Sequence, residues 1–398
     1  MKITDIKTQI VNLNFHNAVI VRIETDDGLT GVAETVMKRK TRTIEQSILQ
    51  LKQYLVGKDP TEIENHWERM YRDSFWVGGA LHSTAISAVD CALWDIFGKA
   101  SGLPVYKLLG GPTRRQVPAY CHCAAGDSPE TFALNVKACQ ARGYQALKTT
   151  LPLFYGKSTV PGDHAINKNG YSGTNGVIDA RWKETEYLDP SIFTRIREFF
   201  VAAREAGGPQ LGIALDCHGR LNPKAALRLC RMLEDLNLLF LEEPIPPENV
   251  EELCLVQRET TIPIAAGERW ATIYGVRPFV EKHAVDLLQC DLVNCGGITG
   301  LKKIAAMAEA HYIGMAPHNP NGPLATIINL HYAAAISNFF ILETIGSEAE
   351  DKLTRELLKN PVNRVAGCLS LPEGPGFGVE LNEEALQNRP YVPCAGWR

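Results

Sequence analysis

The feature that most restricts the fold of this chain is a repeated alternation of short apolar runs with helical stretches between residues 113 and 365. Eight apolar runs occur, at 117–123, 146–150, 212–216, 239–243, 263–267, 287–291, 313–317 and 340–344. Eight strand–helix units in about 250 residues are typical of an α/β chain folded as a (β/α)8 barrel, or TIM barrel. A doubly wound parallel sheet is the alternative, but no glycine-rich phosphate loop follows the first run.

The first 112 residues show a different order, with strands first and helices afterwards. Residues 1–35 contain strand-like runs, two of them joined by Asp27-Gly28, a hairpin signal. The clearest helix of this part is predicted to begin at Ser83 and to end near Gly102. Strands and helices that are segregated predict an α+β domain, which we place at 1–112 as a cap on the barrel. The irregular residues 366–398 are expected to pack on the cap and complete it.

The composition excludes several classes of function. The formal net charge is −4, with 41 Lys and Arg against 45 Asp and Glu, which disfavours a protein that binds nucleic acid broadly. The chain has no run of about 18 apolar residues and no signal-peptide core, so we expect no membrane partner. The 11 cysteines form no CxxC pair, which is typical of reduced thiols in the cytosol. We therefore predict a cytoplasmic protein whose partner is a small molecule.

Three carboxylates lie at the ends of successive predicted strands. Asp216, Glu242 and Glu268 follow one another at a constant spacing of 26 residues. One strand–helix unit per interval places the three at the same height, so they should converge at the C-terminal mouth of the barrel. Hard oxygen ligands in that number suit Mg²⁺. The alternative is three independent salt bridges, which the common spacing disfavours.

A similar spacing, of 23, 27 and 25 residues, continues through the last three predicted strands, which end in Asp291, His318 and Glu343. A carboxylate beside an imidazole fixes the tautomer of the ring and raises its basicity. His318 with Asp291 is therefore predicted to act as a general base. A lone histidine at a strand end is more often structural, but the position shared with the acids favours catalysis.

Two further side chains are predicted to face the same mouth. Because side chains alternate along a strand, His218 should point the same way as Asp216 and supply a second imidazole. The alternative for His218 is a residue that only holds a metal ligand in place. Lys148 ends the second predicted strand. It could neutralise a substrate carboxylate or act as a base, and the alternative is a lysine with its ammonium in solvent.

A long connection and two residues of the cap complete the predicted site. Between Thr150 and the helix near Ile192 lie about 40 residues rich in Gly, Asn, Thr, Lys and Tyr, too many for an ordinary loop of a compact domain. We expect residues 151–188 to form, together with the cap, a lid that excludes water from the mouth of the barrel. Lys38 and Trp76 lie in apparent loops of the cap and are predicted to touch the substrate.

Longer motifs connect these residues to a known family. The cap contains DDGLTGVAE and SAVDCALWDIFGKASGLPVYKLLGG, and the barrel contains LDCHGR, FLEEP, AAGER, QCDLVNCGGITG, MAPHNPNGP and ILE. Over nearly its whole length the chain resembles the enolase superfamily, in the mandelate-racemase-like branch of acid-sugar dehydratases, and within it the D-galactonate and D-mannonate dehydratases. The resemblance implies Mg²⁺ at Asp216, Glu242 and Glu268 and a dyad of His318 with Asp291. It is also the ground on which we expect a homo-oligomer of two to eight subunits.

The resemblance further suggests substrate-binding residues. A histidine at the first barrel strand and a long second loop are shared with the D-mannonate dehydratases, and the resemblance implies His122. The Arg and Tyr pair of those enzymes would fall on Lys148 and Tyr155. Arg269, in the AAGER motif, is assigned to the substrate as well. The chain departs from those enzymes at Lys148, where they have an arginine. It also departs from the racemases, because Lys148-Thr149-Thr150 lacks their second lysine.

The reaction implied is dehydration of a sugar acid. His318 would take the proton next to the carboxylate, and His218 would give a proton to the departing hydroxyl group. Glu343 would hydrogen-bond the substrate carboxylate if it is protonated. An aldonate such as D-galactonate, D-gluconate or D-mannonate would yield a 2-keto-3-deoxy acid. The alternatives are a racemase or epimerase of a 2-hydroxy acid on the same fold, and a catalytically weak protein kept for binding.

Overall fold

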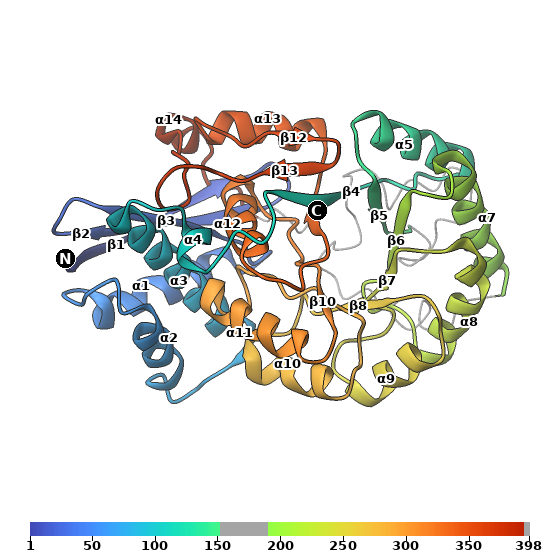
Figure 1. The fold of residues 1–398 in the computed structure, drawn as a ribbon, viewed down its shortest axis with the longest axis horizontal. Coiled ribbons are helices and arrows are strands. Elements are labelled where there is room, and N and C mark those ends of the chain that lie inside the picture. The colour runs from blue at the N-terminus through green and yellow to red at the C-terminus, as the bar shows by residue number, and fades with distance from the viewer. Residues whose placement is uncertain (152–189, 394–398) are drawn as a thin grey trace.

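Eight parallel strands close into a barrel in the computed structural model, which describes residues 1–151 and 190–393 (Figure 1). They are β4 (Gln116–His122), β5 (Ala146–Thr149), β6 (Gly212–Asp216), β7 (Phe240–Glu242), β8 (Ile264–Ala266), β9 (Leu287–Leu288), β10 (Gly314–Met315) and β11 (Leu342–Thr344). Each strand pairs with the next, β11 pairs with β4, and a bridge from Met315 to Phe339 closes the remaining gap. The predicted (β/α)8 barrel is confirmed, and each strand falls within one residue of a predicted run.

A single layer of side chains fills the interior of this barrel. Its members, one from each strand or from the residue beside it, are Tyr120, Ala146, Ala214, Phe240, Ala265, Leu287, Ala316 and Ile341. The four alanines leave room for the rings of Tyr120 and Phe240, whose centroids lie 5.8 Å apart. Because side chains alternate along a strand, the residues two positions later face the space above this layer. That space is the mouth of the barrel.

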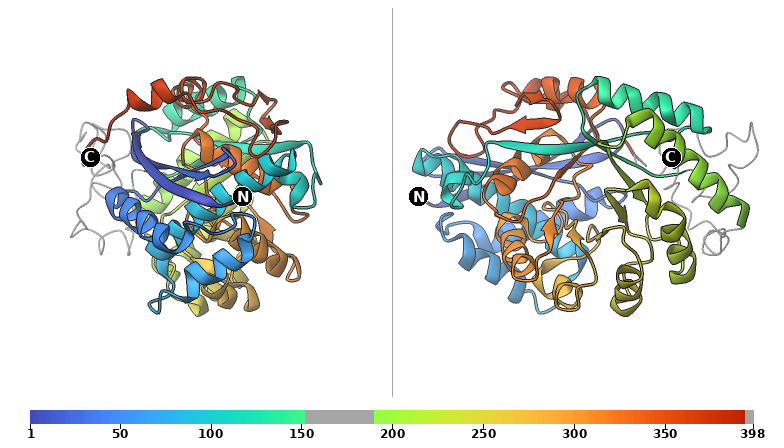
Figure 2. Two further views of the ribbon diagram at one scale, coloured as in Figure 1. Left: turned by 90° about the vertical axis from the view of Figure 1, so that its left-hand side faces the viewer. Right: turned by 45° about the vertical axis from the view of Figure 1, so that its right-hand side comes forward.

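Helices surround the barrel and connect its strands (Figures 1 and 2). They are α5 (Pro129–Ala141), α7 (Pro190–Gly207), α8 (Pro223–Leu233), α9 (Val250–Arg258), α10 (Thr272–Glu281), α11 (Gly297–Glu309), α12 (Pro323–Ala334) and α13 (Glu348–Leu357), with a 3₁₀ turn, η4 (Glu234–Leu236), after α8. Several begin at a side chain that accepts from a free backbone N–H of the first turn, such as Ser128, Asn222 and Asn249. No helix of the described segments is both long and apolar enough to cross a membrane.

The N-terminal part combines a three-stranded antiparallel sheet with helices. The strands are β1 (Ile3–Asn12), β2 (Asn17–Thr25) and β3 (Thr30–Thr35), and the helices are α1 (Thr41–Leu55), α2 (Ile63–Arg72), α3 (Gly79–Ser101) and α4 (Val105–Leu108). Asp27-Gly28 forms the turn between β2 and β3, as predicted. Helix α3 begins at Gly79, four residues before the predicted start at Ser83, because Ser83 bonds its side chain to backbone oxygens and does not cap the helix.

Buried hydrogen bonds attach this cap to the loops that follow barrel strands. Glu34 of β3 accepts from the backbone N–H groups of Gly322 (2.6 Å) and Leu324 (3.1 Å) at the start of α12. Ser87 accepts from the N–H of Gly296 and of Gly297 before α11. The backbone donors at two helix starts thus find their acceptors on the cap, so the cap is a fixed part of the mouth.

The C-terminal residues return along the barrel to the cap. A hairpin of β12 (Arg364–Val365) and β13 (Cys368–Ser370) pairs antiparallel with β4, and the short helix α14 (Glu383–Gln387) follows. Arg22 of the cap pairs with Glu383 at 2.6 Å, and Asp95 of α3 accepts from the N–H of Phe377. Most of the predicted lid, 151–188, lies outside the described residues.

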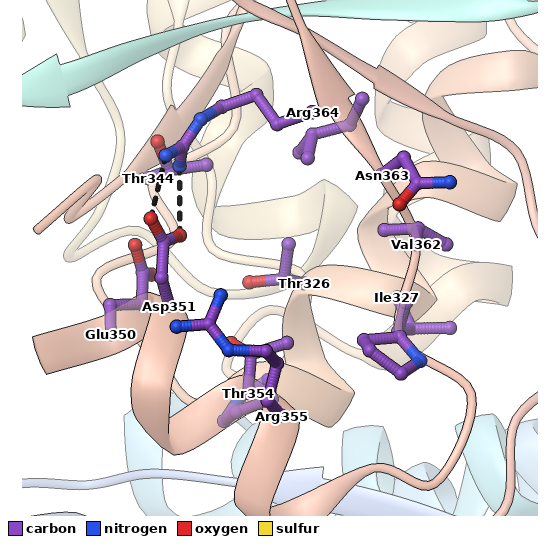
Figure 3. Close-up of a pocket in the computed structure, with 13 residues that line it drawn as sticks. Thr326, Ile327, Thr344, Glu350, Asp351, Thr354, Arg355, Val362, Asn363 and Arg364 are labelled. Carbon is purple, nitrogen blue, oxygen red and sulfur yellow. Dashed lines mark hydrogen bonds and ion pairs between the residues drawn. The ribbon is translucent and has the colours of Figure 1, made fainter. Parts of the chain in front are cut away.

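A cavity of about 310 Å³ lies outside the barrel, between α12, α13 and residues 361–369 (Figure 3). Thr344 at the end of β11 also lines it. Successive side chains of a strand face opposite ways, so Thr344 faces this cavity while Glu343 faces the mouth.

The contact between Glu34 and Gly322 generates a stability prediction. A Cβ at Gly322 would lie 2.3 Å from Oε1 of Glu34, and moving that buried carboxylate would leave two backbone N–H groups without an acceptor. Gly322→Ala is expected to lower the free energy of unfolding by about 1–3 kcal/mol. The control is Gly275→Ala inside α10, where a Cβ meets nothing within 4 Å and a gain of about 0.4–1 kcal/mol is expected. Urea unfolding measures both, and a Gly322→Ala protein as stable as the parent contradicts the role of Glu34.

Candidate active site

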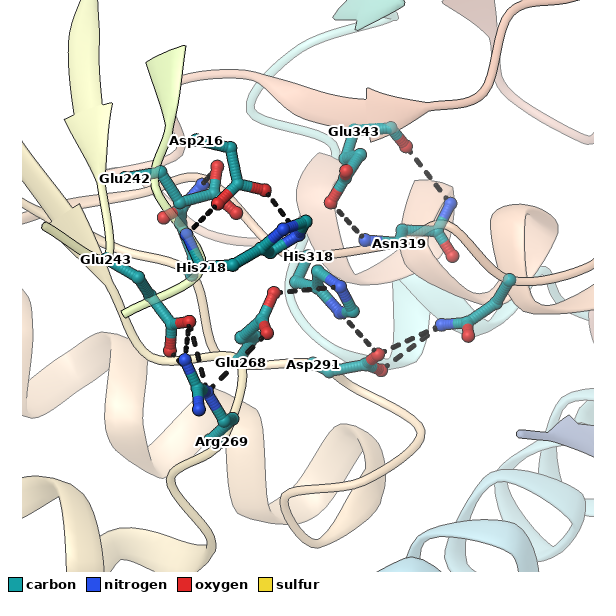
Figure 4. A network of polar contacts seen from close by, with 12 residues as sticks. Asp216, His218, Glu242, Glu243, Glu268, Arg269, Asp291, His318, Asn319 and Glu343 are labelled. Carbon is teal, nitrogen blue, oxygen red and sulfur yellow. Dashed lines mark hydrogen bonds and ion pairs between the residues drawn. The ribbon is translucent and has the colours of Figure 1, made fainter. Parts of the chain in front are cut away.

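The mouth of the barrel holds a network of charged side chains (Figure 4). On each strand, the position two residues after the member of the interior layer faces the mouth. These eight positions are His122, Lys148, Asp216, Glu242, Gly267, Gln289, His318 and Glu343. The site therefore forms the next layer of side chains above the packed interior layer, two residues further along each strand. Asp216 and Glu242 are paired in register between β6 and β7, as the equal spacing predicted.

Glu268 reaches the network in a different way. It is one residue out of step with the alternation of β8, which ends at Ala266. Gly267 has a φ of +139°, and a Cβ there would lie 3.0 Å from the backbone nitrogens of Gln289 and Cys290. This backbone conformation, which L side chains rarely adopt, turns Glu268 into the mouth. The spacing identified the residue but not the turn that directs it.

Lys148 is the buried cation at the centre of the network. Its Nζ lies 2.8 Å from Glu242, 2.7 Å from Glu343 and 3.5 Å from Asp216. Burial by itself lowers the pKa of Lys148, but the carboxylates outweigh it and raise the pKa well above its usual value. With 4% of its surface exposed, Lys148 contradicts the alternative of a lysine with its ammonium in solvent, and its role as a base or as a carboxylate-binding cation stays a prediction.

The carboxylates around Lys148 differ in their protonation. Burial raises the pKa of Glu242 well above its usual value, and the charge of Asp216 raises it further. For Glu343 burial acts in the same direction, but Lys148, His318 and His122 outweigh it and hold the pKa well below the usual value. Glu343 is thus ionised, so the condition for its predicted hydrogen bond to a substrate carboxylate is not met in this state.

His318 forms the predicted pair with Asp291. Its Nδ1 lies 2.8 Å from Asp291, and its Nε2 lies 3.1 Å from Glu268. Asp291 also accepts from the backbone N–H of Val293 and from the side chain of Asn321, which the sequence reasoning did not single out. These bonds hold the carboxylate that orients the ring. Burial lowers the pKa of His318, but the surrounding carboxylates, Glu268 first, raise it to about 10.

His218 forms a second imidazole–carboxylate pair, across the mouth. Its Nε2 lies 3.0 Å from Asp216, which also accepts from the backbone N–H of His218 at 2.8 Å. Strand β6 has ended at Asp216, and His218 has a φ of +50°. The ring is therefore placed by a left-handed turn rather than by strand alternation, the reason given in its prediction. Burial lowers the pKa of His218, but Asp216 reverses the effect and raises it.

The predicted metal ligands fit Mg²⁺ by donor chemistry and by strand position. Asp216, Glu242 and Glu268 are carboxylates at the ends of β6, β7 and β8, and oxygen donors are what Mg²⁺ prefers. As their side chains lie, the first two point at Lys148 and Glu268 points at His318. Within residues 1–151 and 190–393 no group of three or more His, Cys, Asp or Glu side chains is arranged to hold a metal ion. Glu268 would have to turn from the imidazole toward the other two carboxylates.

Two of the residues predicted to bind substrate have protein partners at the mouth. His122 lies 2.5 Å from Glu343 through its Nε2. Arg269 donates two hydrogen bonds of 3.0 Å from Nε to the buried carboxylate of Glu243 and lies 3.8 Å from Glu268. His122 lines the mouth directly, whereas Arg269 is positioned to hold the segment that carries Glu268.

The cap residues differ in where they lie. Lys38 has an exposed side chain and interacts electrostatically with Glu268, Glu343 and Asp291, which places it beside the mouth. Trp76 lies between α2 and α3 with 83% of its surface exposed and its ring edge-on to Phe75. No interaction joins Trp76 to the charged network of the described segments.

The other predicted contact to substrate, Tyr155, lies outside the described residues. Its assignment stays a prediction.

Two further residues of the network, besides Asn321, were missed by the sequence reasoning. Gln289 donates to Glu242 at 2.7 Å, and the backbone N–H of Asn319 donates to Glu343 at 2.9 Å. Gln289 could have been found by counting two residues on from Leu287, since alternation places it in the mouth. Asn319 binds Glu343 through its backbone N–H, which nearly every residue type has, so the sequence could not have identified this contact.

Comparison with known proteins agrees with this geometry. Residues 2–110 match the mandelate racemase/muconate lactonizing enzyme N-terminal domain, and residues 188–385 match the enolase C-terminal domain-like family. The D-galactonate dehydratase of Xanthomonas campestris is 34% identical, over 100% of this chain and 96% of its own. The D-mannonate dehydratase of Caulobacter vibrioides is 34% identical, over 98% of this chain and 95% of its own.

Solved structures share the whole fold. A member of the enolase superfamily from Salmonella Typhimurium has a TM-score of 0.85 at 31% identity. The match spans 98% of this chain and 99% of that one. An enolase from Agrobacterium radiobacter, with bound sodium and L-malate, has a TM-score of 0.82 at 30% identity, over 98% of this chain and 96% of its own. The chain therefore belongs to the mandelate racemase-like branch of the enolase superfamily, and it is an enzyme of the hydro-lyase class, a dehydratase.

Proposed function

We propose that this enzyme removes the proton next to the carboxylate of an aldonate and expels the hydroxyl group of the next carbon, which yields a 2-keto-3-deoxy acid. The observation that carries the proposal is the presence of two imidazoles in one mouth, each bound to its own carboxylate. His318 pairs with Asp291 and His218 pairs with Asp216. Elimination needs a base for the carbon-bound proton and an acid for the leaving hydroxyl, and two separate pairs can supply them.

His318 is the base in this proposal. Its Nδ1 faces Asp291, so the ring donates there and Nε2 is the atom that accepts the substrate proton. With a pKa of about 10 the ring is protonated at neutral pH while Glu268 stays beside it. The neutral form of His318 therefore becomes favoured when a cation neutralises the charge of Glu268. The readiness of the base is thus linked to cation binding at the three strand-end carboxylates.

His218 is the acid in this proposal. As the side chains lie, Asp216 raises the pKa of His218. A cation bound by Asp216 would oppose that effect and make the imidazolium a better proton donor to the leaving hydroxyl. A hydroxide is a poor leaving group in water, and its protonation as it departs removes that obstacle. The lack of a second lysine after Lys148 leaves no lysine pair for two-way proton transfer.

Mg²⁺ is the cation that we assign to Asp216, Glu242 and Glu268. Bound there, it would supply positive charge that stabilises the negative charge developing on the substrate carboxylate. Lys148 pairs with both Asp216 and Glu242, and its positive charge offsets the repulsion between the two carboxylates. Lys38 at the rim adds a second cation suited to an anionic substrate.

The substrate class follows from the relatives and from the charges of the mouth. Relatives act on D-galactonate and D-mannonate by name, and D-gluconate differs from these only in stereochemistry. A screen of aldonic and aldaric acids for 2-keto-3-deoxy product, by its semicarbazone absorbance, identifies the substrate. Exchange of the α-proton in D₂O without any loss of water would instead indicate a racemase or epimerase.

Substitution of the two histidines separates their roles. His318→Asn is expected to abolish both α-proton exchange and dehydration, whereas His218→Asn is expected to abolish dehydration and leave exchange measurable. Each loss should be about 10²–10⁴-fold, the usual contribution of one general acid or base. Proton NMR in D₂O follows exchange, and the semicarbazone assay follows dehydration.

The matched control is His283→Asn, because His283 is exposed after α10 and has a φ of +54°, which asparagine tolerates. Its activity should equal that of the parent enzyme. If His218→Asn loses exchange while His318→Asn keeps it, the two roles are reversed. Full dehydration in both variants would remove the proposed mechanism.

Titration of His318 tests the assigned cation without measuring turnover. In metal-free protein its pKa should be near 10, so the ring should carry its proton throughout the neutral range. Addition of MgCl₂ should lower that pKa saturably, because positive charge at Glu268 cancels the field that raises it. Glu268→Gln without metal should lower it as well. Nitrogen-15 NMR of labelled histidine reads the titration, and a pKa that is unmoved by MgCl₂ contradicts the metal assignment.

A further inference from the structure

The cavity between α12, α13 and residues 361–369 is separate from the mouth of the barrel. Its volume of about 310 Å³ is at the lower end of the range of small-molecule sites. Side chains of two helices, a strand end and the segment before β13 line it. None of them belongs to the network that binds Lys148, so a ligand here would not compete for the mouth.

One end of the cavity is polar and contains an unpaired guanidinium. Arg364 pairs with Asp351 through bonds of 3.1 and 2.7 Å and donates to the hydroxyl of Tyr144 at 2.6 Å. Arg355 of α13 turns its guanidinium into the same space, toward Asp351 and Thr326 (Figure 3). No hydrogen bond or ion pair joins Arg355 to any described residue, whereas the charge of Asp351 is already matched by Arg364.

The remaining carboxylate of the cavity has its own partner. Glu350 accepts from the backbone N–H of Gly346. Burial raises the pKa of Glu350 to about 7, with Asp351 adding to the effect and Arg364 opposing it. Glu350 is thus engaged by a backbone donor rather than by Arg355.

The other side of the cavity is apolar. Its walls are formed by Pro323, Ile327, Pro361, Val362 and Leu369. A ligand that fits both ends must therefore combine an anionic group with an apolar body. A sugar acid, which carries a hydroxyl on nearly every carbon, would leave hydroxyls unpaired against these walls.

We propose that this cavity is a second binding site, for a small carboxylate with an apolar body, whose carboxylate pairs with Arg355. A guanidinium binds a carboxylate through two parallel hydrogen bonds, which gives the site its selectivity for charge. Thr326 and Thr354 also line the cavity. Thr326 donates its hydroxyl proton to the carbonyl of Gly322, so the hydroxyl of Thr354 is the one that can complete the contact. Thr326 also accepts from the side chain of Asn319 at 2.9 Å, and the backbone of Asn319 holds Glu343, so a bound ligand would lie two hydrogen bonds from the active site.

Benzoate is a suitable probe and benzamide is its uncharged counterpart. Calorimetric titration of the full chain should show binding of benzoate, and benzamide should bind at least tenfold more weakly. Arg355→Gln should weaken benzoate at least tenfold, the order expected for the loss of a charge-assisted hydrogen bond. Lys352→Gln removes the same charge from an exposed position of α13 that does not line the cavity, and it should bind benzoate like the parent.

Methyl NMR locates the bound probe. The δ1 methyl of Ile327 lines the cavity, while Ile341 lies in the interior layer below the mouth. Benzoate should shift the Ile327 signal saturably and leave Ile341 unmoved. The proposal is overturned if benzoate does not bind, if Arg355→Gln binds it as tightly as Lys352→Gln, if benzamide binds equally well, or if Ile341 moves in place of Ile327. Equal melting temperatures of the two variants show that neither change acts through the fold.

Discussion

The buried ammonium of Lys148 is the interaction on which the rest of the site depends. The barrel brings Asp216, Glu242 and Glu343 to one side of its mouth, where their mutual repulsion and their loss of water oppose folding. A single cation within 3.5 Å of all three makes that arrangement tolerable. Removing one partner of such a buried network costs roughly 3–5 kcal/mol. The same cation sorts the carboxylates by charge, with Glu343 ionised and Glu242 inclined to hold a proton.

The histidines complete this balance and gain their chemistry from it. Each ring is buried among carboxylates, which raise its pKa against the effect of burial. As the side chains lie, the Nε2 atom of His318 is occupied by Glu268, and the Nε2 atom of His218 is occupied by Asp216.

The barrel and most of its reactive residues could be predicted because strand period and strand alternation fix which side chains share a height and a face. Asp216, Glu242, His318 and Glu343 followed from that rule, whereas Asp291 lies three residues beyond the end of β9 and was identified only by its place after a predicted strand. Partners across the mouth could not be predicted, since they depend on contacts between distant segments: Arg269 binds Glu243, and Glu343 binds Lys148. The exposed position of Trp76 depends on the path of the loop between α2 and α3, which the local sequence does not specify.

Gly267 is the one position of the eight above the interior layer that presents no side chain to the mouth. Its backbone turn directs the neighbouring Glu268, and a Cβ at this position would lie 3.0 Å from the backbone nitrogens of Gln289 and Cys290, just after β9. Any replacement would redirect that carboxylate while leaving the interior layer and the outer helices untouched. In a lineage of such barrels this glycine would be retained under selection for turnover rather than for folding. Gly267 serves the site because glycine has no Cβ, and an inspection of substrate contacts alone would overlook this residue.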